Sequence, residues 1–259
     1  MLNHIPKYVC FSFVPFVMAS LVTVVLYCIG VIPTYYLIYT LIGWILIPGL
    51  GLAVGYHRMF SHQNYQNIPL WKENIILFLG TLSGQGSSIT YSALHRGYHH
   101  PYSDTEKDIH SPIHGKYNSF IGWATKLTES NPVIKLKFAG RLLSKSNHVW
   151  FHKHHLKIMY IVPLTVALFD WKLSLALLCL PAGIAMLQDN TVNVFCHIKT
   201  FMGYRNFETK DNSENNFILG YLGWGQGWHN NHHHDPKMFS FRVTWYEFDP
   251  CVIFIPLLK

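Results

Sequence analysis

Charged side chains are scarce in this chain of 259 residues. Only 13% of its residues are Asp, Glu, Lys or Arg, whereas soluble domains carry about 25%. Residues 8–57 include none of the four, and half of all residues are hydrophobic. This hydrophobicity excludes intrinsic disorder, which requires few apolar residues and a high net charge. The shortage of charge also argues against a simple soluble globular protein.

Cysteine is equally sparse and carries no pattern. The five cysteines form no Cys-x-x-Cys pair, and all lie among apolar residues. A disulfide framework, a thiolate zinc site and an iron–sulfur cluster are therefore not expected. The chain also contains no haem motif of the HPGG kind and no GxGxxG nucleotide motif.

The long uncharged segment predicts membrane-spanning helices. Its 50 residues are enough for two helices of about 20 residues each. A turn at 30–33 divides it into spans at 9–30 and 34–55. A signal peptide is disfavoured because the apolar run is too long. A second apolar region, broken by Asp170 and Lys172, predicts shorter spans at 157–170 and 173–194.

The basic residues predict the orientation of these spans. Of the 20 Lys and Arg residues, Lys172 alone lies in a proposed hairpin tip. By the positive-inside rule the termini and a helical cap at 56–156 and 195–259 are cytoplasmic. The net charge of +7 then reflects sidedness, and no nucleic-acid partner is expected. The predicted fold is all-α, a single integral membrane domain (1–259) with four transmembrane helices in two hairpins.

Histidine is abundant, with 17 residues against 13 Asp and Glu. Most of them form four clusters at 57–62, 95–100, 148–155 and 229–234, and His197 stands alone. Neutral imidazole without thiolate suits iron, copper, zinc or nickel. A metal transporter is disfavoured because transporters place polar ligands inside their spans, whereas these clusters lie outside the spans or at their ends.

Regular helix geometry predicts how the histidines would share metal ions. His229, His232 and His233 are spaced i, i+3 and i+4 and would share one face. His95 and His99 are also i, i+4, and His100 would point about 100° away from His99. His57 and the residue five positions on, His62, would diverge by about 140°, which suits two neighbouring metals better than one.

Three of the clusters together resemble the histidine boxes of the membrane fatty-acid desaturases. They read HRMFSH, HRGYHH and HNNHHH, and the resemblance is greatest to the acyl-CoA Δ9 (stearoyl-CoA type) branch. The segments HHPYSDTEKDIHSP and GQGWHNNHH are also similar to that branch, over about residues 49–235. One departure is that three residues separate His95 from His99, where the branch usually has two.

This resemblance implies a di-iron enzyme that uses O2 to introduce a cis double bond into a saturated acyl chain, with acyl-CoA as the expected substrate. A membrane hydroxylase on the same scaffold is the alternative. Asn193 matches a residue that holds a metal-bound water. The implied iron ligands are His57, His62, His95, His99, His100, His197, His229, His232 and His233.

Other histidines are not expected to bind metal. The cluster at 148–155 matches a region that supplies no ligand in the family. The remaining non-ligands are His4, His110, His114 and His234. Because all ligand groups must meet on one side of the membrane, the uncharged stretch at 74–94 is predicted to be a cytosolic or interfacial helix and not a span.

The substrate and redox partners lead to further expectations. Ile45 and Gly49 are candidates for the closed end of an apolar substrate tunnel. Arg58 and Arg96 are candidates either to bind a charged head group or to form ion pairs near the site or at the membrane interface. Electrons would come from a separate ferredoxin, rubredoxin or cytochrome b5 with its reductase. The host membrane would be the bacterial inner membrane or the endoplasmic reticulum.

Polar neighbours of the boxes are expected to orient either the metal ligands or the substrate head group. Asp104, Thr105 and Asp108 follow the second box closely. Metal-bound imidazoles need hydrogen-bond acceptors for their second nitrogen, and these side chains could provide them.

Overall fold

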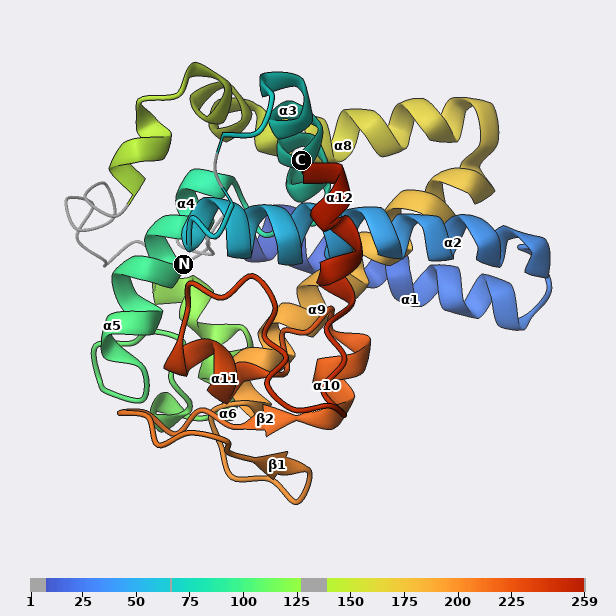
Figure 1. Cartoon of the computed structure of the whole chain (residues 1–259). Coiled ribbons are helices and arrows are strands. Elements are labelled where there is room, and N and C mark those ends of the chain that lie inside the picture. The colour runs from blue at the N-terminus through green and yellow to red at the C-terminus, as the bar shows by residue number, and fades with distance from the viewer. Residues whose placement is uncertain (1–7, 66, 127–138, 259) are drawn as a thin grey trace.

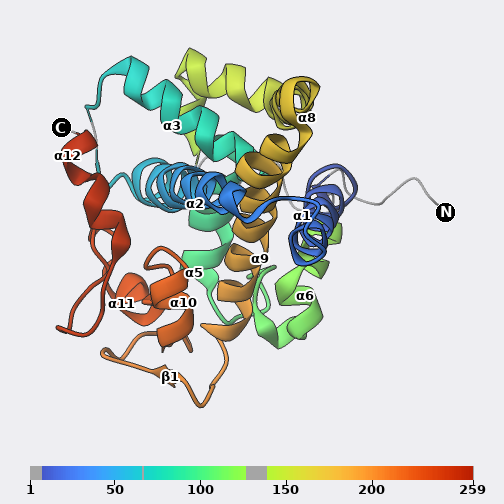
Figure 2. The same cartoon turned by 90° about the vertical axis from the view of Figure 1, so that its right-hand side faces the viewer.

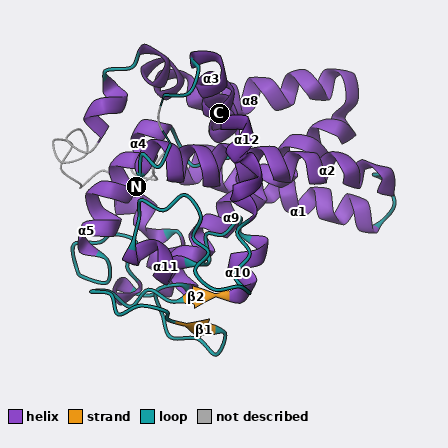
Figure 3. Cartoon of the chain, in the orientation of Figure 1, coloured by secondary structure: helices purple, strands orange, loops and turns teal. Residues whose placement is uncertain are grey.

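A computed structural model describes residues 8–65, 67–126 and 139–258. Helices make up most of the regular structure (Figure 3). The sheet within the described residues consists of β1 (Gly203–Tyr204) and β2 (Asn215–Asn216), which pair antiparallel. The expectation of a mainly helical chain is confirmed.

Two long apolar helices begin the described chain. The first comprises η1 (Val9–Phe13) and α1 (Val14–Cys28), and the second comprises η2 (Thr34–Tyr36), α2 (Leu37–Trp44) and η3 (Ile45–Ser61). The second helix runs to Ser61, six residues beyond the end expected from hydropathy at 55. It therefore carries most of the first histidine cluster within its own last turns.

A third apolar helical region runs from Ser146 to Phe195 and comprises α8 (Ser146–Ser174), η7 (Leu175–Cys179) and α9 (Leu180–Phe195). Asp170 leaves helical geometry, with φ −153° and ψ 101°, and the chain folds back there (Figure 1). Asp170 accepts a hydrogen bond from the Tyr36 hydroxyl at 2.5 Å and others from the backbone N–H groups of Lys172 and Leu173. The polar interruption in the sequence thus makes the bend.

The long helices pack closely where glycines allow it. α9 lies beside both α1 and α2, as the view along the helices shows (Figure 2). A side chain at Gly183 would meet Ser20 of α1, and one at Gly43 would meet the backbone carbonyl of Leu177. The Ser20 hydroxyl of α1 donates a hydrogen bond to the carbonyl of Cys179, at the end of η7, at 2.9 Å. This bond links α1 to the helix that continues as α9.

The stretch at 74–94 forms two helices and not the single helix expected. α3 (Leu70–Leu82) and α4 (Ser88–Leu94) are separated by a turn. Gly84 and Gly86 both have φ of +77°, a conformation that ends a helix and that glycine adopts at little cost. The Ser87 hydroxyl then accepts a hydrogen bond from the backbone N–H of Thr90 and caps α4.

Short helical elements complete the described structure. They are η4 (His95–His99), α5 (His100–Tyr102), η5 (Pro112–His114), α6 (Lys116–Phe120), η6 (Gly122–Lys126), α10 (Phe217–Leu222), α11 (His229–His234), η8 (Pro250–Phe254) and α12 (Ile255–Leu258).

Candidate metal centre

The nine histidines predicted as ligands come together in two adjacent groups. The side-chain nitrogens of each group all lie within 4.8 Å of one another. One group has five members, His57, His62, His95, His100 and His232, and the other has four, His99, His197, His229 and His233. Residues up to 176 positions apart in sequence therefore converge on one place.

The first box corrects the expectation drawn from a regular helix. His57 and His62 belong to the same group, with ring centroids 4.9 Å apart. The reason is that η3 is a π-helix, in which the His62 N–H bonds to the His57 carbonyl at 3.1 Å. An i→i+5 turn brings residues five apart onto one face.

The second and third boxes are each divided between the groups. η4 is also a π-helix, so His95 lies in the same group as His100. We expected His95 to share a face with His99, and this expectation was wrong. In α11, His229 and His233 share one group through i, i+4 spacing, whereas His232 points into the other. The expectation that all three would hold one metal was therefore wrong.

The spacing of the Nε2 atoms fits metal coordination. Within the five-histidine group the His57–His232, His62–His95, His95–His100 and His100–His232 separations are 2.8–3.0 Å. The other group has separations of 2.9 Å for His197–His229 and 3.1 Å for His99–His233. Ligands at right angles around one ion, with metal–nitrogen bonds of about 2.1 Å, would be about 3.0 Å apart.

The opposite ring nitrogens are held by acceptors. Nδ1 of His99 lies 3.1 Å from Asp108, and Nδ1 of His197 lies 3.1 Å from Asp104. These contacts place two of the expected orienting residues beside box histidines. Thr105 does not join them, because its hydroxyl donates to the carbonyl of Tyr102.

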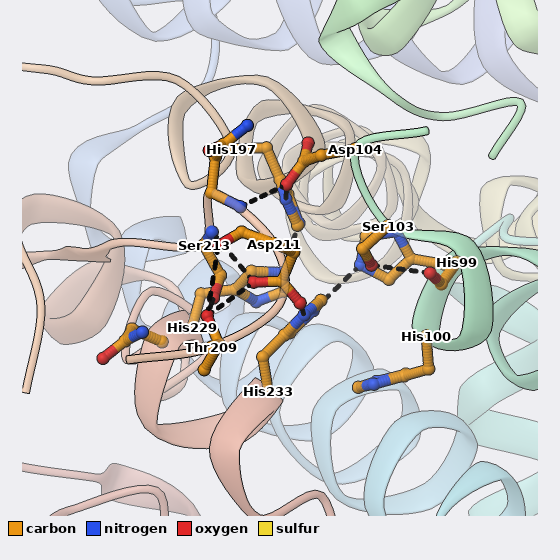
Figure 4. A network of polar contacts seen from close by, with 12 residues as sticks. His99, His100, Ser103, Asp104, His197, Thr209, Asp211, Ser213, His229 and His233 are labelled. Atoms are coloured by element: carbon orange, nitrogen blue, oxygen red, sulfur yellow. Dashed lines mark hydrogen bonds and ion pairs between the residues drawn. The ribbon is translucent and has the colours of Figure 1, made fainter. Parts of the chain in front are cut away.

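Two further acceptors were missed from the sequence. Nδ1 of His233 lies 2.8 Å from Asp211, and both residues are drawn in Figure 4. Nδ1 of His57 lies 2.8 Å from the Gln226 side-chain oxygen. Asp211 could have been noticed because the chain has only 13 Asp and Glu residues, so that each one is a candidate partner for a histidine. Gln226 lies inside the motif GQGWHNNHH, beside the third box.

Burial keeps most of these imidazoles neutral. It lowers the pKa of His95, His100, His229 and His232 well below the usual value, and neighbouring histidines lower it further. Burial lowers the pKa of His233 to about 4, although its contact with Asp211 acts in the opposite direction. Neutral imidazole is the form that coordinates a metal ion.

A cavity of about 50 Å³ lies against both groups. Its lining includes Asn193, the residue expected near a metal-bound water, and the apolar side chains of Leu94 and Trp123. A neighbouring cavity of about 100 Å³ shares Leu94 and Trp123 with it and continues toward Leu156 on α8. The lining of the first cavity also includes Asp189, which accepts a hydrogen bond from the Tyr91 hydroxyl at 3.2 Å.

Comparison with known proteins agrees with this arrangement. The family described as "Fatty acid desaturase" matches residues 30–251. The chain belongs to the fatty acid desaturase family.

Curated relatives of this desaturase-family chain include cyanobacterial and plant proteins. The sn-1 stearoyl-lipid 9-desaturase of Synechocystis is 32% identical over 80% of this chain and 63% of its own length. The protein of the same name from Anabaena variabilis is 30% identical, over 85% of this chain and 78% of its own length. Delta-9 acyl-lipid desaturase 1 of Arabidopsis thaliana is 28% identical over 78% of this chain. The chain spans 57–66% of the length of three Arabidopsis relatives.

Arg58 of this desaturase-family chain is placed differently from Arg96. The Arg58 guanidinium is fully buried and pairs with Asp249 at 3.0 Å. It also donates to the carbonyls of Ala53 and Phe239 and lies 3.9 Å from the centre of the Phe241 ring. Its contacts are thus intramolecular, which favours an ion-pairing role over head-group binding. Arg96 is half-buried at a cavity near the five-histidine group.

The two residues expected at a tunnel end lie elsewhere. Gly49 faces the Trp224 ring, and Ile45 packs at the edge of the main hydrophobic core. Neither lines the cavity beside the histidine groups. Their role in chain-length selection stays a prediction.

The cluster at 148–155 joins helices. His148 is fully buried and bridges the Ser88 hydroxyl, 2.8 Å from Nδ1, and the Glu73 carboxylate, 2.7 Å from Nε2. His152 lies 2.7 Å from the Ser87 hydroxyl. No histidine of this cluster joins a metal-type group within the described residues. Because Glu73 lies on α3 and Ser88 on α4, these contacts fasten both helices to α8.

The other expected non-ligands are dispersed. The His110 ring packs at a tilt against the Trp123 ring, with centroids 4.5 Å apart, and its Nδ1 lies 3.4 Å from Asp108. His99, Asp108 and His110 together form a third group whose geometry could hold a metal ion. His114 is exposed, and His234 stacks on Phe207 at 3.8 Å. His4 lies outside the described residues.

Proposed function

We propose that this chain is an O2-dependent di-iron desaturase that introduces a cis double bond into a saturated fatty acyl chain, at the Δ9 position. The observation that carries the proposal is the pair of imidazole groups, with five and four members and Nε2 separations near 3 Å. Two irons bound there would, with O2, supply an oxidant able to remove hydrogen from unactivated methylenes. No protein side chain has that reactivity.

The residues of the chain contribute binding, orientation and exclusion of water. The nine histidines would hold the metals in their neutral form, and Asp104, Asp108 and Asp211 fix the rings with Nδ1–H as donor. Asn193 would hold a water beside the four-histidine group, and its place in the lining of the same cavity as His99 and His229 supports this role. The cavity along Leu94 and Trp123 would receive part of the alkyl chain and restrict the position of its methylenes.

The membrane arrangement we propose has four spans in two hairpins, with the histidine groups on the cytoplasmic side. Three helical regions are long and apolar enough to cross a bilayer: Val9–Cys28, Thr34–Ser61 and Ser146–Phe195. The third folds back at Asp170 and would cross twice. The basic residues of the cap support its cytoplasmic placement. A bacterial inner membrane or the endoplasmic reticulum would be the host.

For the acyl carrier we propose a membrane lipid. Relatives from cyanobacteria are named for stearoyl-lipid and palmitoyl-lipid substrates. Acyl-CoA is the second candidate because Arg96 and Lys237 line a cavity of about 240 Å³ beside His62 and His100, where phosphate could bind. A separate ferredoxin, rubredoxin or cytochrome b5 system would supply electrons.

The experiment is expression in a host that lacks its own Δ9 desaturase and contains a competent electron donor. Gas chromatography of total fatty acids should show a new monounsaturated product, absent with His232→Ala. Pulse labelling with a saturated fatty acid then distinguishes a lipid carrier from acyl-CoA. With a lipid carrier, the labelled acyl chains should become unsaturated only after they have entered membrane lipid. A hydroxylated product would establish the alternative reaction, and no new product at all would refute the enzyme proposal.

A further inference from the structure

The two histidine groups differ in the charge around them. Three of the four rings in one group face carboxylates: His99 faces Asp108, His197 faces Asp104 and His233 faces Asp211. These carboxylates are held in place by the backbone. Asp211 accepts from the Ser213 N–H at 3.0 Å, Asp104 from the Asn212 N–H at 2.6 Å and Asp108 from the His110 N–H at 3.0 Å.

Among the residues that the structure describes, no such anion faces the five-histidine group. The His57 ring faces Gln226, which is neutral, and the buried Nδ1 of His232 has no partner among the described residues. Gln226 also accepts a hydrogen bond from the Arg58 guanidinium at 3.3 Å, which places a cation behind this ring. No carboxylate forms an ion pair with a histidine of this group in the described part of the chain.

Access to the two groups differs as well. His62 and His100 line the cavity of about 240 Å³ that Lys237, an exposed residue, bounds. Both rings are half-buried, whereas His99, His197 and His229 of the other group are buried. A metal ion in the five-histidine group would therefore have a shorter route to solvent.

From these contacts we infer that the two metal sites are unequal and that the four-histidine site binds its metal more tightly. Asp104, Asp108 and Asp211 would act as positioning residues that strengthen the rings as donors. Such outer partners are each worth about 10–100-fold in metal affinity. Three of them outweigh the one additional imidazole of the other group, which also lies near Arg58. This inference rests on the proposed dinuclear function.

The test uses the purified full chain, loaded with Fe²⁺ under anaerobic conditions. Samples are equilibrated with increasing concentrations of a chelator, and the iron retained per chain is measured by mass spectrometry. The wild type should lose iron in two steps, with a plateau at one iron per chain. Asp211→Asn should move the second step about 10–100-fold toward weaker binding. Asp211→Glu should restore part of that loss.

Two matched variants distinguish a carboxylate placed against a ligand histidine from a change in the net charge of the protein. Gln226→Glu places a carboxylate behind His57 and should tighten the first step. Asp235→Asn removes an exposed carboxylate that forms no ion pair with a histidine in the described residues, and it should leave both steps unchanged. Thermal melting confirms that each variant is folded, and Asp104→Asn replaces Asp211→Asn if the latter does not fold.

Release of both irons in a single step, or an effect of Asp211→Asn confined to the first step, would overturn the inference. A chain that binds two irons in two steps but makes no unsaturated product would refute the proposed reaction and leave the inference standing. A chain that binds fewer than two irons refutes both.

Discussion

The buried pair of Arg58 and Asp249 allows a quantitative test of what Arg58 does. Both side chains are fully buried, and the guanidinium and carboxylate lie 3.0 Å apart. Removing one partner of a buried pair costs about 3–5 kcal/mol because the other charge is left without compensation. Asp249 would retain hydrogen bonds from the N–H groups of Phe241 and Cys251, so the lower end of that range applies.

Arg58→Met should therefore destabilise the protein by about 3 kcal/mol. In a chain of this size, that corresponds to a fall of about 6–12 °C in the melting temperature. The assay is thermal unfolding of the detergent-purified protein. Adding Asp249→Asn to Arg58→Met should recover part of the loss, because no uncompensated charge then remains. Arg242→Met is the control, since Arg242 is exposed.

The outcome distinguishes two roles for Arg58. If it is structural, the KM for the acyl substrate should not change in the variant that remains folded. If Arg58→Met melted within about 1 °C of the wild type and its KM rose strongly, the ion-pair argument would be refuted. Binding of the substrate head group would then be the better account of Arg58.

Three further predictions follow from the site. His148→Ala should cost about 1–3 kcal/mol, because the Ser88 side chain loses its partner and Glu73 keeps only Lys145 and Asn147, yet leave the iron content unchanged; loss of iron would show that this cluster binds metal after all. Asn193→Ala should retain both irons and lower product formation, as elemental analysis and gas chromatography can check. The metal-free protein should lose stability as pH falls below about 6.5, because the pKa of half-buried His95 and His100 is lowered in the folded protein and only the unfolded chain takes up those protons; denaturant midpoints that do not change between pH 7 and pH 5 would contradict this.

The sequence was sufficient to select the nine histidines but not to divide them. Their selection came from the resemblance to the histidine boxes of the desaturase family, which spacing and neighbouring residues such as those of GQGWHNNHH made visible. Their division into two groups depended on whether a helical turn is α or π. The two kinds of turn differ by one residue in the hydrogen-bond register. Residue propensities do not distinguish these registers, so His57 and His62 were expected to diverge although they converge in the structure.

Other features depended on contacts between distant residues. Arg58 and Asp249 are 191 positions apart, and no local pattern indicates that one lies against the other. The role of His148 likewise depends on Glu73, 75 positions earlier. The break between α3 and α4, by contrast, could have been read from Gly84 and Gly86, which lie in the middle of an otherwise uncharged stretch.

The π-turn at His95–His99 also accounts for the one residue by which the second box exceeds its usual length. The His100 N–H bonds to the His95 carbonyl, and an i→i+5 ring encloses one residue more than the α-helical ring. The wider π-turn accommodates the extra residue between His95 and His99. His95 therefore still belongs to the same histidine group as His100. The motif is therefore better defined by backbone register than by residue count. Searches for related proteins should accept boxes of either length.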